Sequence, residues 1–123
     1  MKMNPVGWFE IAAKDLRRAS RFYGDVFGFE MTSGRVNEYE MVFFPMDGEA
    51  PGAAGALIAG EGYEPTPVGT IVYFPVDDIA ATLVKVEKAG GKTLFPKKSI
   101  GPHGYIAWFS DSEGNSIGMH SRS

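Results

Sequence analysis

Few side chains in this chain could carry out chemistry, and the most suggestive pair is Glu10 and His120. The sequence contains two histidines and no cysteine, which excludes thiolate metal ligands, disulfides and cysteine nucleophiles. A carboxylate beside an imidazole orients the ring, as a general base requires. Two interpretations stay open: a pair that binds or transforms a ligand, and a buried polar pair that only satisfies its own hydrogen bonds.

The other histidine, His103, lies in the turn Gly101-Pro102-His103-Gly104. It is either an ordinary surface turn residue or part of a loop over the mouth of a pocket, since loops on rigid scaffolds often carry function. No GxSxG, HExxH or CxxC motif is present. The sequence therefore offers no standard catalytic signature beside these candidates.

Strands must position these residues, and alternation along each strand assigns them to faces. In residues 5–13, one face carries Phe9, Ile11 and Ala13, which we expect to pack under a helix. The opposite face, extended by later strands, carries a mixture of aromatic, acidic and imidazole side chains: Trp8, Glu10, Tyr73 and His120. Such a mixture is typical of a pocket lining, so we predict that these residues contact a ligand.

The chain contains an internal repeat, because residues 9–31 and 72–94 share one pattern at an offset of 63 residues. Each copy has an apolar strand, an aspartate, an amphipathic helix and a glycine stop. Asp15 and Asp78 are the predicted N-caps. Gly28, and Gly90 or Gly91, are the predicted left-handed helix ends.

Apolar runs separated by turn signals predict eight strands, at 5–13, 28–33, 39–46, 53–59, 68–76, 92–97, 104–110 and 115–121. Each half then reads βαβββ, with one helix covering one face of a four-stranded sheet. We predict an α+β fold in a single domain spanning 1–123. Its first module covers about 1–62 and its second about 63–123.

Composition narrows the classes of partner. The chain has 123 residues, of which 44% are hydrophobic, and a net charge of −3. Nucleic-acid binding requires a basic face, which this balance does not favour. No apolar run approaches the ~18 residues of a membrane span, and the first residues do not resemble a secretory leader. We therefore expect a cytoplasmic protein whose partner is a small molecule.

Three segments of the chain resemble the vicinal oxygen chelate superfamily, which includes glyoxalase I, bleomycin- and fosfomycin-resistance proteins and extradiol dioxygenases. They are Arg21-Phe22-Tyr23-Gly24-Asp25-Val26-Phe27-Gly28-Phe29, Val76-Asp77-Asp78-Ile79 with Gly90-Gly91-Lys92, and Phe109-Ser110-Asp111-Ser112-Glu113-Gly114-Asn115. The resemblance covers nearly the whole chain and is closest to small proteins related to lactoylglutathione lyase. It implies two βαβββ modules whose curved sheets surround a cavity.

The superfamily's chemistry implies a divalent metal, held by residues on the inward strands. Carried over by position, the ligand sites fall on Trp8, Ile71, Gly118 and a residue within 55–59, and none of these can ligate a metal. We therefore expect no metal and no cofactor. Trp8 at its position either plugs the cavity or offers a flat wall for stacking.

Three functions stay open. The first is metal-independent binding or conversion of a small metabolite, with Glu10 and His120 as polar anchors. The second is a metal-dependent isomerase or lyase of the glyoxalase type with a rearranged site. The third is a ligand-sequestering dimer like the drug-resistance members.

We also expect a homodimer, because exposed sheet edges and open sheet faces favour pairing, and two-fold closure is the commonest symmetry of soluble homo-oligomers. The apolar stretch 41–46 is a candidate contributor, unless Phe43 or Phe44 simply fills the chain's own core. The sequence leaves open whether the two modules pair within one chain or between two chains.

Overall fold

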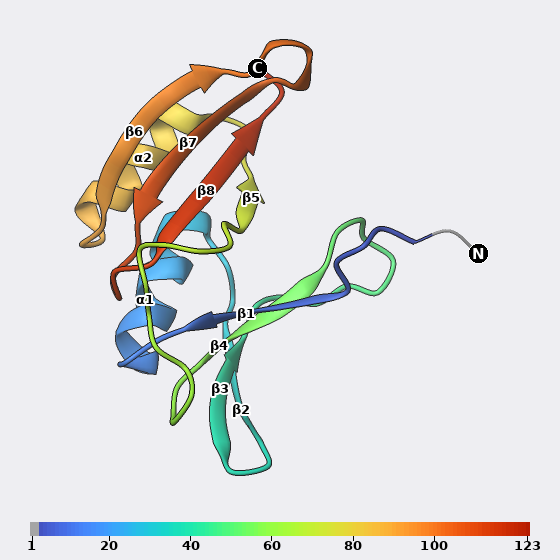
Figure 1. Cartoon of the computed structure of the whole chain (residues 1–123), viewed down its shortest axis with the longest axis vertical. Coiled ribbons are helices and arrows are strands. Elements are labelled where there is room, and N and C mark those ends of the chain that lie inside the picture. The colour runs from blue at the N-terminus through green and yellow to red at the C-terminus, as the bar shows by residue number, and fades with distance from the viewer. Residues whose placement is uncertain (1–2) are drawn as a thin grey trace.

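Residues 3–123 are described by a computed structural model, in which each half of the chain forms a four-stranded sheet with one helix. The first sheet has the order β1-β4-β3-β2, and its strands are β1 (Trp8–Ala12), β2 (Thr32–Val36), β3 (Tyr39–Phe43) and β4 (Ala54–Ile58). The second has the order β5-β8-β7-β6, with β5 (Tyr73–Pro75), β6 (Lys92–Ser99), β7 (Tyr105–Ser110) and β8 (Ser116–Ser121). The matching orders confirm the predicted α+β fold built from a repeated βαβββ unit (Figure 1).

The helices α1 (Leu16–Phe27) and α2 (Ile79–Lys88) begin where the aspartates predict. Asp15 Oδ1 accepts a hydrogen bond from the Arg18 backbone N–H, and Asp78 Oδ1 accepts one from that of Ala81, both at 3.0 Å. Gly28 is left-handed, with φ of 74°, and ends α1. After α2 the left-handed residue is Gly90, with φ of 101°.

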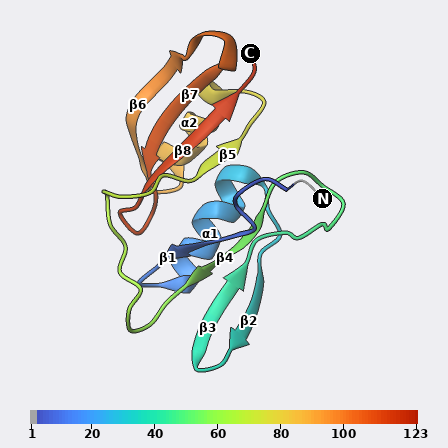
Figure 2. The same cartoon turned by 45° about the vertical axis from the view of Figure 1, so that its right-hand side comes forward.

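Both helices lie on the same side of the two sheets and contact each other (Figure 2). The core therefore forms between helices and sheets, where Ile11, Leu57, Phe74, Phe109 and Met119 are buried. The other side of each sheet has no helix over it, and we call it the open face. Alternation assigned these faces correctly, because Ile11 lies in the core whereas Trp8 and Tyr73 are 42% and 40% exposed.

The turn at residues 111–115 fastens the second module to the first. Glu113 accepts hydrogen bonds from the backbone N–H groups of Lys14 and Asp15, both at 2.9 Å, and its carboxylate forms a two-pronged ion pair with Arg18 at 2.7 and 3.0 Å. Burial by itself would raise the pKa of the Glu113 carboxyl, but these hydrogen bonds outweigh it and lower the pKa to about 2.

A buried hydrogen bond makes a second tie between the modules. The Tyr23 hydroxyl on α1 donates to Asp111 at 2.7 Å. The Tyr23 pKa is raised well above its usual value, mainly because the phenol is buried and secondly because the Asp111 carboxylate is adjacent. Asn115 donates to the Ala12 carbonyl at 2.8 Å. The motif residues that carried the family resemblance thus hold the fold together.

The structure shifts or shortens several of the predicted strands, and β2 and β5 differ most from their predicted ranges. β2 starts at Thr32 rather than at 28, because Phe29 and Met31 pack against the core as part of the connection from α1. β5 has three residues instead of nine, so Ile71 precedes the strand. Pro75 is found in β5, which is an edge strand, where a residue without a backbone N–H is tolerated.

Side chains of the apolar stretch 41–46 lie on both faces of the first sheet. Val42 and Phe44 are buried in the chain's own core. Met41 and Phe43 point the other way and join Ala56, Ile58 and neighbouring tyrosines in a smaller cluster on the open face. Within residues 3–123, neither helix has the length and apolar character needed to cross a bilayer.

Candidate functional site

A cavity of about 740 Å³ lies where the edge strands β1 and β5 approach each other. Its walls come from the two copies of the repeat and from the loop between β3 and β4; they include Trp8, Glu10, Ile71, Tyr73 and Gly52. We call it the inter-module cavity. Its volume is within the range of ~300–1,000 Å³ that is usual for small-molecule sites.

The first module contributes an indole and a carboxylate to this cavity. Trp8 and Glu10 are two residues apart on β1, so both side chains lie on the open face. The Trp8 Nε1–H donates to Glu10 Oε2 at 3.3 Å. Ala54 and Ala56 are their partners on β4, and these small side chains leave the space above the strands to the larger neighbours.

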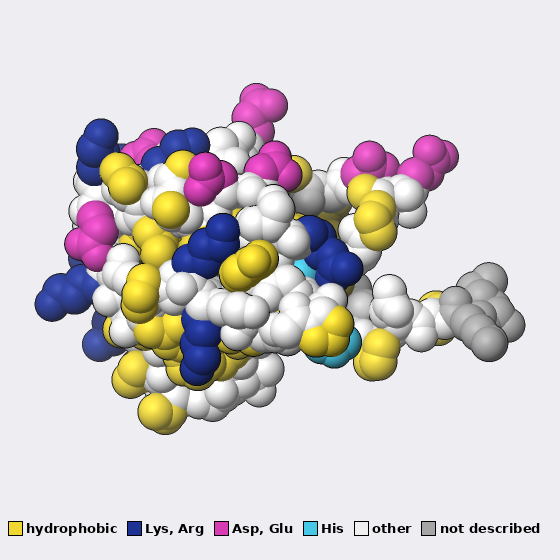
Figure 3. Space-filling model, turned by 90° about the horizontal axis from the view of Figure 1, so that it is seen from above, with side chains coloured by type: hydrophobic (Ala, Val, Ile, Leu, Met, Phe, Trp, Pro, Cys, Tyr) yellow, Lys and Arg dark blue, Asp and Glu magenta, His cyan; other side chains and the backbone are white. Residues whose placement is uncertain are grey.

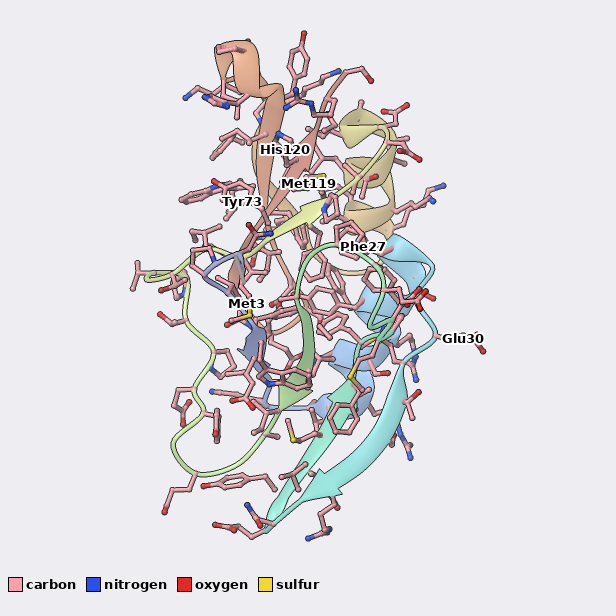
Figure 4. The ribbon with its side chains drawn as sticks, turned by 90° about the vertical axis from the view of Figure 1, so that its right-hand side faces the viewer. Met3, Phe27, Glu30, Tyr73, Met119 and His120 are labelled. Carbon is pink, nitrogen blue, oxygen red and sulfur yellow. The ribbon has the colours of Figure 1, made fainter. Side chains whose placement is uncertain are left out.

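The second module contributes an aromatic surface centred on Tyr73. The Trp108 Nε1–H donates to the Tyr73 hydroxyl at 2.7 Å, and the Trp108 ring lies 5.3 Å from that of Phe95. The Tyr73 ring covers Gly118, where a Cβ atom would overlap the ring. In Figure 4, Tyr73 projects from β5 away from α2 and from Phe27, whereas Met119 lies on the helix side of β8.

His120 does not line the inter-module cavity that contains Glu10. Its Nε2 lies 2.6 Å from the backbone carbonyl of His103, and because a carbonyl only accepts, this nitrogen carries the hydrogen. Arg122 donates to the same carbonyl at 3.2 Å. His120 lines a second cavity of about 540 Å³ near the start of α2. Figure 3, which looks onto this end of the molecule, shows histidine atoms beside Lys and Arg side chains.

The predicted ligand contacts are therefore divided. Trp8, Glu10 and Tyr73 line the inter-module cavity. His120 and His103 contact each other and do not line it, so the expected Glu10–His120 pair is not formed within one chain. The reason lies in the register of β8, where Gly118 is level with Tyr73 and His120 is level with Pro75, two residues further on.

The residues at the family's metal positions do not suit a divalent ion. Trp8 and Ile71 line the inter-module cavity with carbon, Gly118 is covered by Tyr73, and residues 55–59 contain only glycine, alanine, leucine and isoleucine. In the part of the chain that the structure describes, no three His, Cys, Asp or Glu side chains cluster as a metal site requires. The side chains at these positions therefore do not fit the metal on which the family's chemistry depends.

Trp108, Phe43 and Tyr63 lie on the open faces, but the sequence did not predict them as ligand contacts. Trp108 and Phe43 alternate with buried neighbours on their strands, so alternation could have placed them beside Tyr73 and Trp8. Tyr63 follows the Gly60-Glu61-Gly62 turn, and no periodic signal marks it.

The chain thus has two βαβββ modules with a cavity between them. This arrangement defines a class of proteins rather than one activity. A family model described as the Glyoxalase/Bleomycin resistance protein/Dioxygenase superfamily matches residues 6–119. The chain belongs to this superfamily.

Known relatives agree at the level of family and fold. A glyoxylase-like domain-containing protein from Didymella fabae is 34% identical over 121 residues, covering 95% of this chain and 93% of the relative. A glyoxalase-related enzyme from Fulvimarina pelagi superposes with a TM-score of 0.72 at 21% identity, covering 97% of this chain and 88% of that one. TnmS3, an antibiotic-binding protein from Streptomyces sp. CB03234, superposes with a TM-score of 0.68 at 23% identity, covering 100% and 99% of the two chains.

Proposed function

We propose that the chain binds a small molecule with a flat aromatic part in the inter-module cavity, without the divalent metal on which its family's chemistry depends. The observation that carries this proposal is the side-chain replacement at the family's metal positions. Trp8 stands at one of them, and the Tyr73 ring covers Gly118 at another. Two exposed aromatic rings thus occupy the wall from which metal ligands would project.

The energetics favour an aromatic ligand. Trp8 and Tyr73 each leave about two-fifths of their surface exposed, which is apolar area that a ligand ring can cover. Offset or edge-to-face contacts between aromatic rings add about 0.5–1.5 kcal/mol beyond the area they bury. Trp8 and Tyr73 would bind and orient the ligand ring without taking part in a reaction. The proposal therefore covers both a binding protein and an enzyme whose reaction is not identified.

A ligand-sequestering homodimer is a second candidate, and the uncovered open faces favour it. A second copy that covered both faces would enclose a ligand lying between Trp8 of one chain and Tyr73 or Trp108 of the other. The fold similarity to an antibiotic-binding protein is compatible with this function. A glyoxalase-type isomerase or lyase with a rearranged site would instead bring Glu10 of one chain to His120 of another.

Fluorescence titration with 2-naphthol, a flat and neutral probe, tests the proposal. We expect saturable binding that persists in excess EDTA and is lost in Trp8→Ala and Tyr73→Ala. Val84→Ala is the matched control, because Val84 is an exposed hydrophobic residue of α2 outside the cavity, and it should bind as the wild type does.

Elemental analysis of untagged protein completes the test. Absence of saturable binding, or binding that disappears with EDTA, would overturn the proposal. So would stoichiometric Zn²⁺, Ni²⁺ or Mn²⁺ that survives gel filtration, which would favour the metal-dependent isomerase or lyase.

A further inference from the structure

The open face of the first sheet holds one carboxylate among four aromatic rings, which we call the acid–aromatic cluster: Glu10, Trp8, Phe43, Tyr39 and Tyr63. The Trp8 and Phe43 rings are 6.3 Å apart and meet edge to face at 60°. The Tyr39 and Tyr63 rings are 5.2 Å apart at 80°. Phe43, Tyr39 and Tyr63 pack on the same small apolar base, formed by Met41, Ala56 and Ile58.

Glu10 connects the two ring pairs. It is the partner of Ala56 on β4, and Ala56 is in turn the partner of Phe43 on β3, so the three residues form one row across the sheet. On one side Glu10 accepts from Trp8 Nε1. On the other it lies close enough to Tyr63 to be the largest cause of the raised pKa of that phenol.

No cation balances this carboxylate in the described part of the chain. The two ion pairs found there join Arg18 to Glu113 and Arg35 to Glu40. Glu38 is a second carboxylate near the cluster, since it also contributes to the raised Tyr63 pKa. The surface around the rings therefore carries uncompensated negative charge.

We propose that the acid–aromatic cluster binds the cationic group of an organic amine, preferably a methylated or quaternary ammonium. Aromatic faces attract such cations through the ring quadrupole, and tryptophan does so most strongly. An ammonium with methyl groups has no need for several hydrogen-bond acceptors, so a single carboxylate suffices where a metal would require three ligands. This inference rests on the proposed function, because Trp8 and Glu10 also line the inter-module cavity. It adds that the ligand is cationic.

Choline and its neutral carbon isostere, 3,3-dimethyl-1-butanol, form a matched pair of probes that differ in charge and not in shape. We expect choline to bind about tenfold more tightly than the alcohol, the size of a cation–π contact supported by one carboxylate. Titrations monitored by NMR should shift the Trp8 indole N–H signal and leave that of Trp108 in place. The two tryptophans thus report separately on the two open faces.

Glu10→Gln keeps the size of the side chain and removes its charge. It should weaken choline binding about tenfold and leave the binding of the alcohol unchanged. Glu30→Gln is the charge-matched control, because Glu30 is an exposed residue that projects away from Tyr73 and the cavity (Figure 4). Trp8→Leu should abolish the preference for the cation.

Two outcomes would overturn the inference. Equal affinity for choline and the alcohol would do so, and so would a Glu10→Gln variant whose choline binding is unchanged. If Glu10→Gln instead weakens self-association while choline binding persists, the partner of Glu10 is a basic side chain of a second copy. Retained 2-naphthol binding in these cases would leave the proposed function standing, whereas loss of both probes would overturn both.

Discussion

At the scale of single residues, Gly118 shows how this chain departs from the metal-binding pattern of its family. The Tyr73 ring lies against the Cα of Gly118, in the space that a ligand side chain at this position would occupy. A residue with a Cβ atom at position 118 is therefore excluded while the Tyr73 ring keeps this position. Restoring a metal ligand at position 118 therefore requires that Tyr73 change as well.

We predict that Gly118→Ala destabilises the protein by about 1–3 kcal/mol, the usual cost of overpacking. In the background of Tyr73→Ala, the same substitution should cost less than about 0.5 kcal/mol, because the ring that it would strike is absent. Urea unfolding of the four proteins in this double-mutant cycle gives the coupling energy. Equal costs in both backgrounds would show that the Tyr73 ring does not lie over Gly118.

At the scale of elements, both helices begin at an aspartate that accepts a backbone hydrogen bond. We predict that Asp15→Ala and Asp78→Ala each lower the free energy of unfolding by about 0.5–2 kcal/mol, the usual loss for an N-cap. Ligand binding should be unaffected, because neither residue lines the inter-module cavity. Thermal melts compared with those of Asp25→Ala, an exposed aspartate late in α1, provide the measurement and its control.

The turn at residues 111–115 makes stability depend on pH. The Glu113 carboxyl has its pKa lowered from 4.5 to about 2 in the folded state, so the folded protein holds its charged form more strongly than the unfolded chain does. The stabilisation is complete above about pH 4.5 and is lost as the pH falls toward 2. A shift of this size corresponds to at most about 3 kcal/mol.

Glu113→Gln should therefore reduce the free energy of unfolding at pH 7 and flatten its decline between pH 4.5 and 2. Urea unfolding across this pH range is the measurement. Glu64→Gln, at an exposed position, should keep the decline of the wild type. A decline that is as steep in Glu113→Gln as in the wild type would place the pH dependence elsewhere.

At the scale of the whole molecule, the two open faces and the unpaired edges of β1 and β5 leave apolar surface uncovered in a single chain. We propose that two copies pair with the first sheet of each facing the second sheet of the other. Such an arrangement covers the apolar surface of both open faces and encloses a ligand between them.

Light scattering at micromolar concentration tests this pairing. We expect a mass about twice the chain's 13.3 kDa. Trp8→Glu, which places a second negative charge on the first open face, should reduce that mass toward one chain, whereas Val84→Glu on α2 should not. A wild-type mass that stays near a single chain at every concentration would overturn the dimer.

Local sequence patterns determined the elements and their faces. The aspartate caps, the glycine stop after α1 and the alternation in β1 and β8 depend on neighbours within a few residues, so they could be predicted without tertiary contacts. The same holds for the replacement of metal ligands at Trp8 and Gly118. The ends of β2 and β5 could not be predicted as well, because core packing of Phe29 and Met31 decides where the first of them starts.

Only the tertiary structure decided which of the open-face residues meet. Glu10 shares its cavity with Tyr73 rather than with His120, because the edge strands β1 and β5 approach each other there while His120 is bound to the carbonyl of His103. The roles of Glu113 and Tyr63 likewise arise from contacts across 95 and more than 50 positions of the chain, respectively. Patterns within a strand or helix carry no information about such contacts, since they specify the direction of a side chain and not the neighbour that it finds.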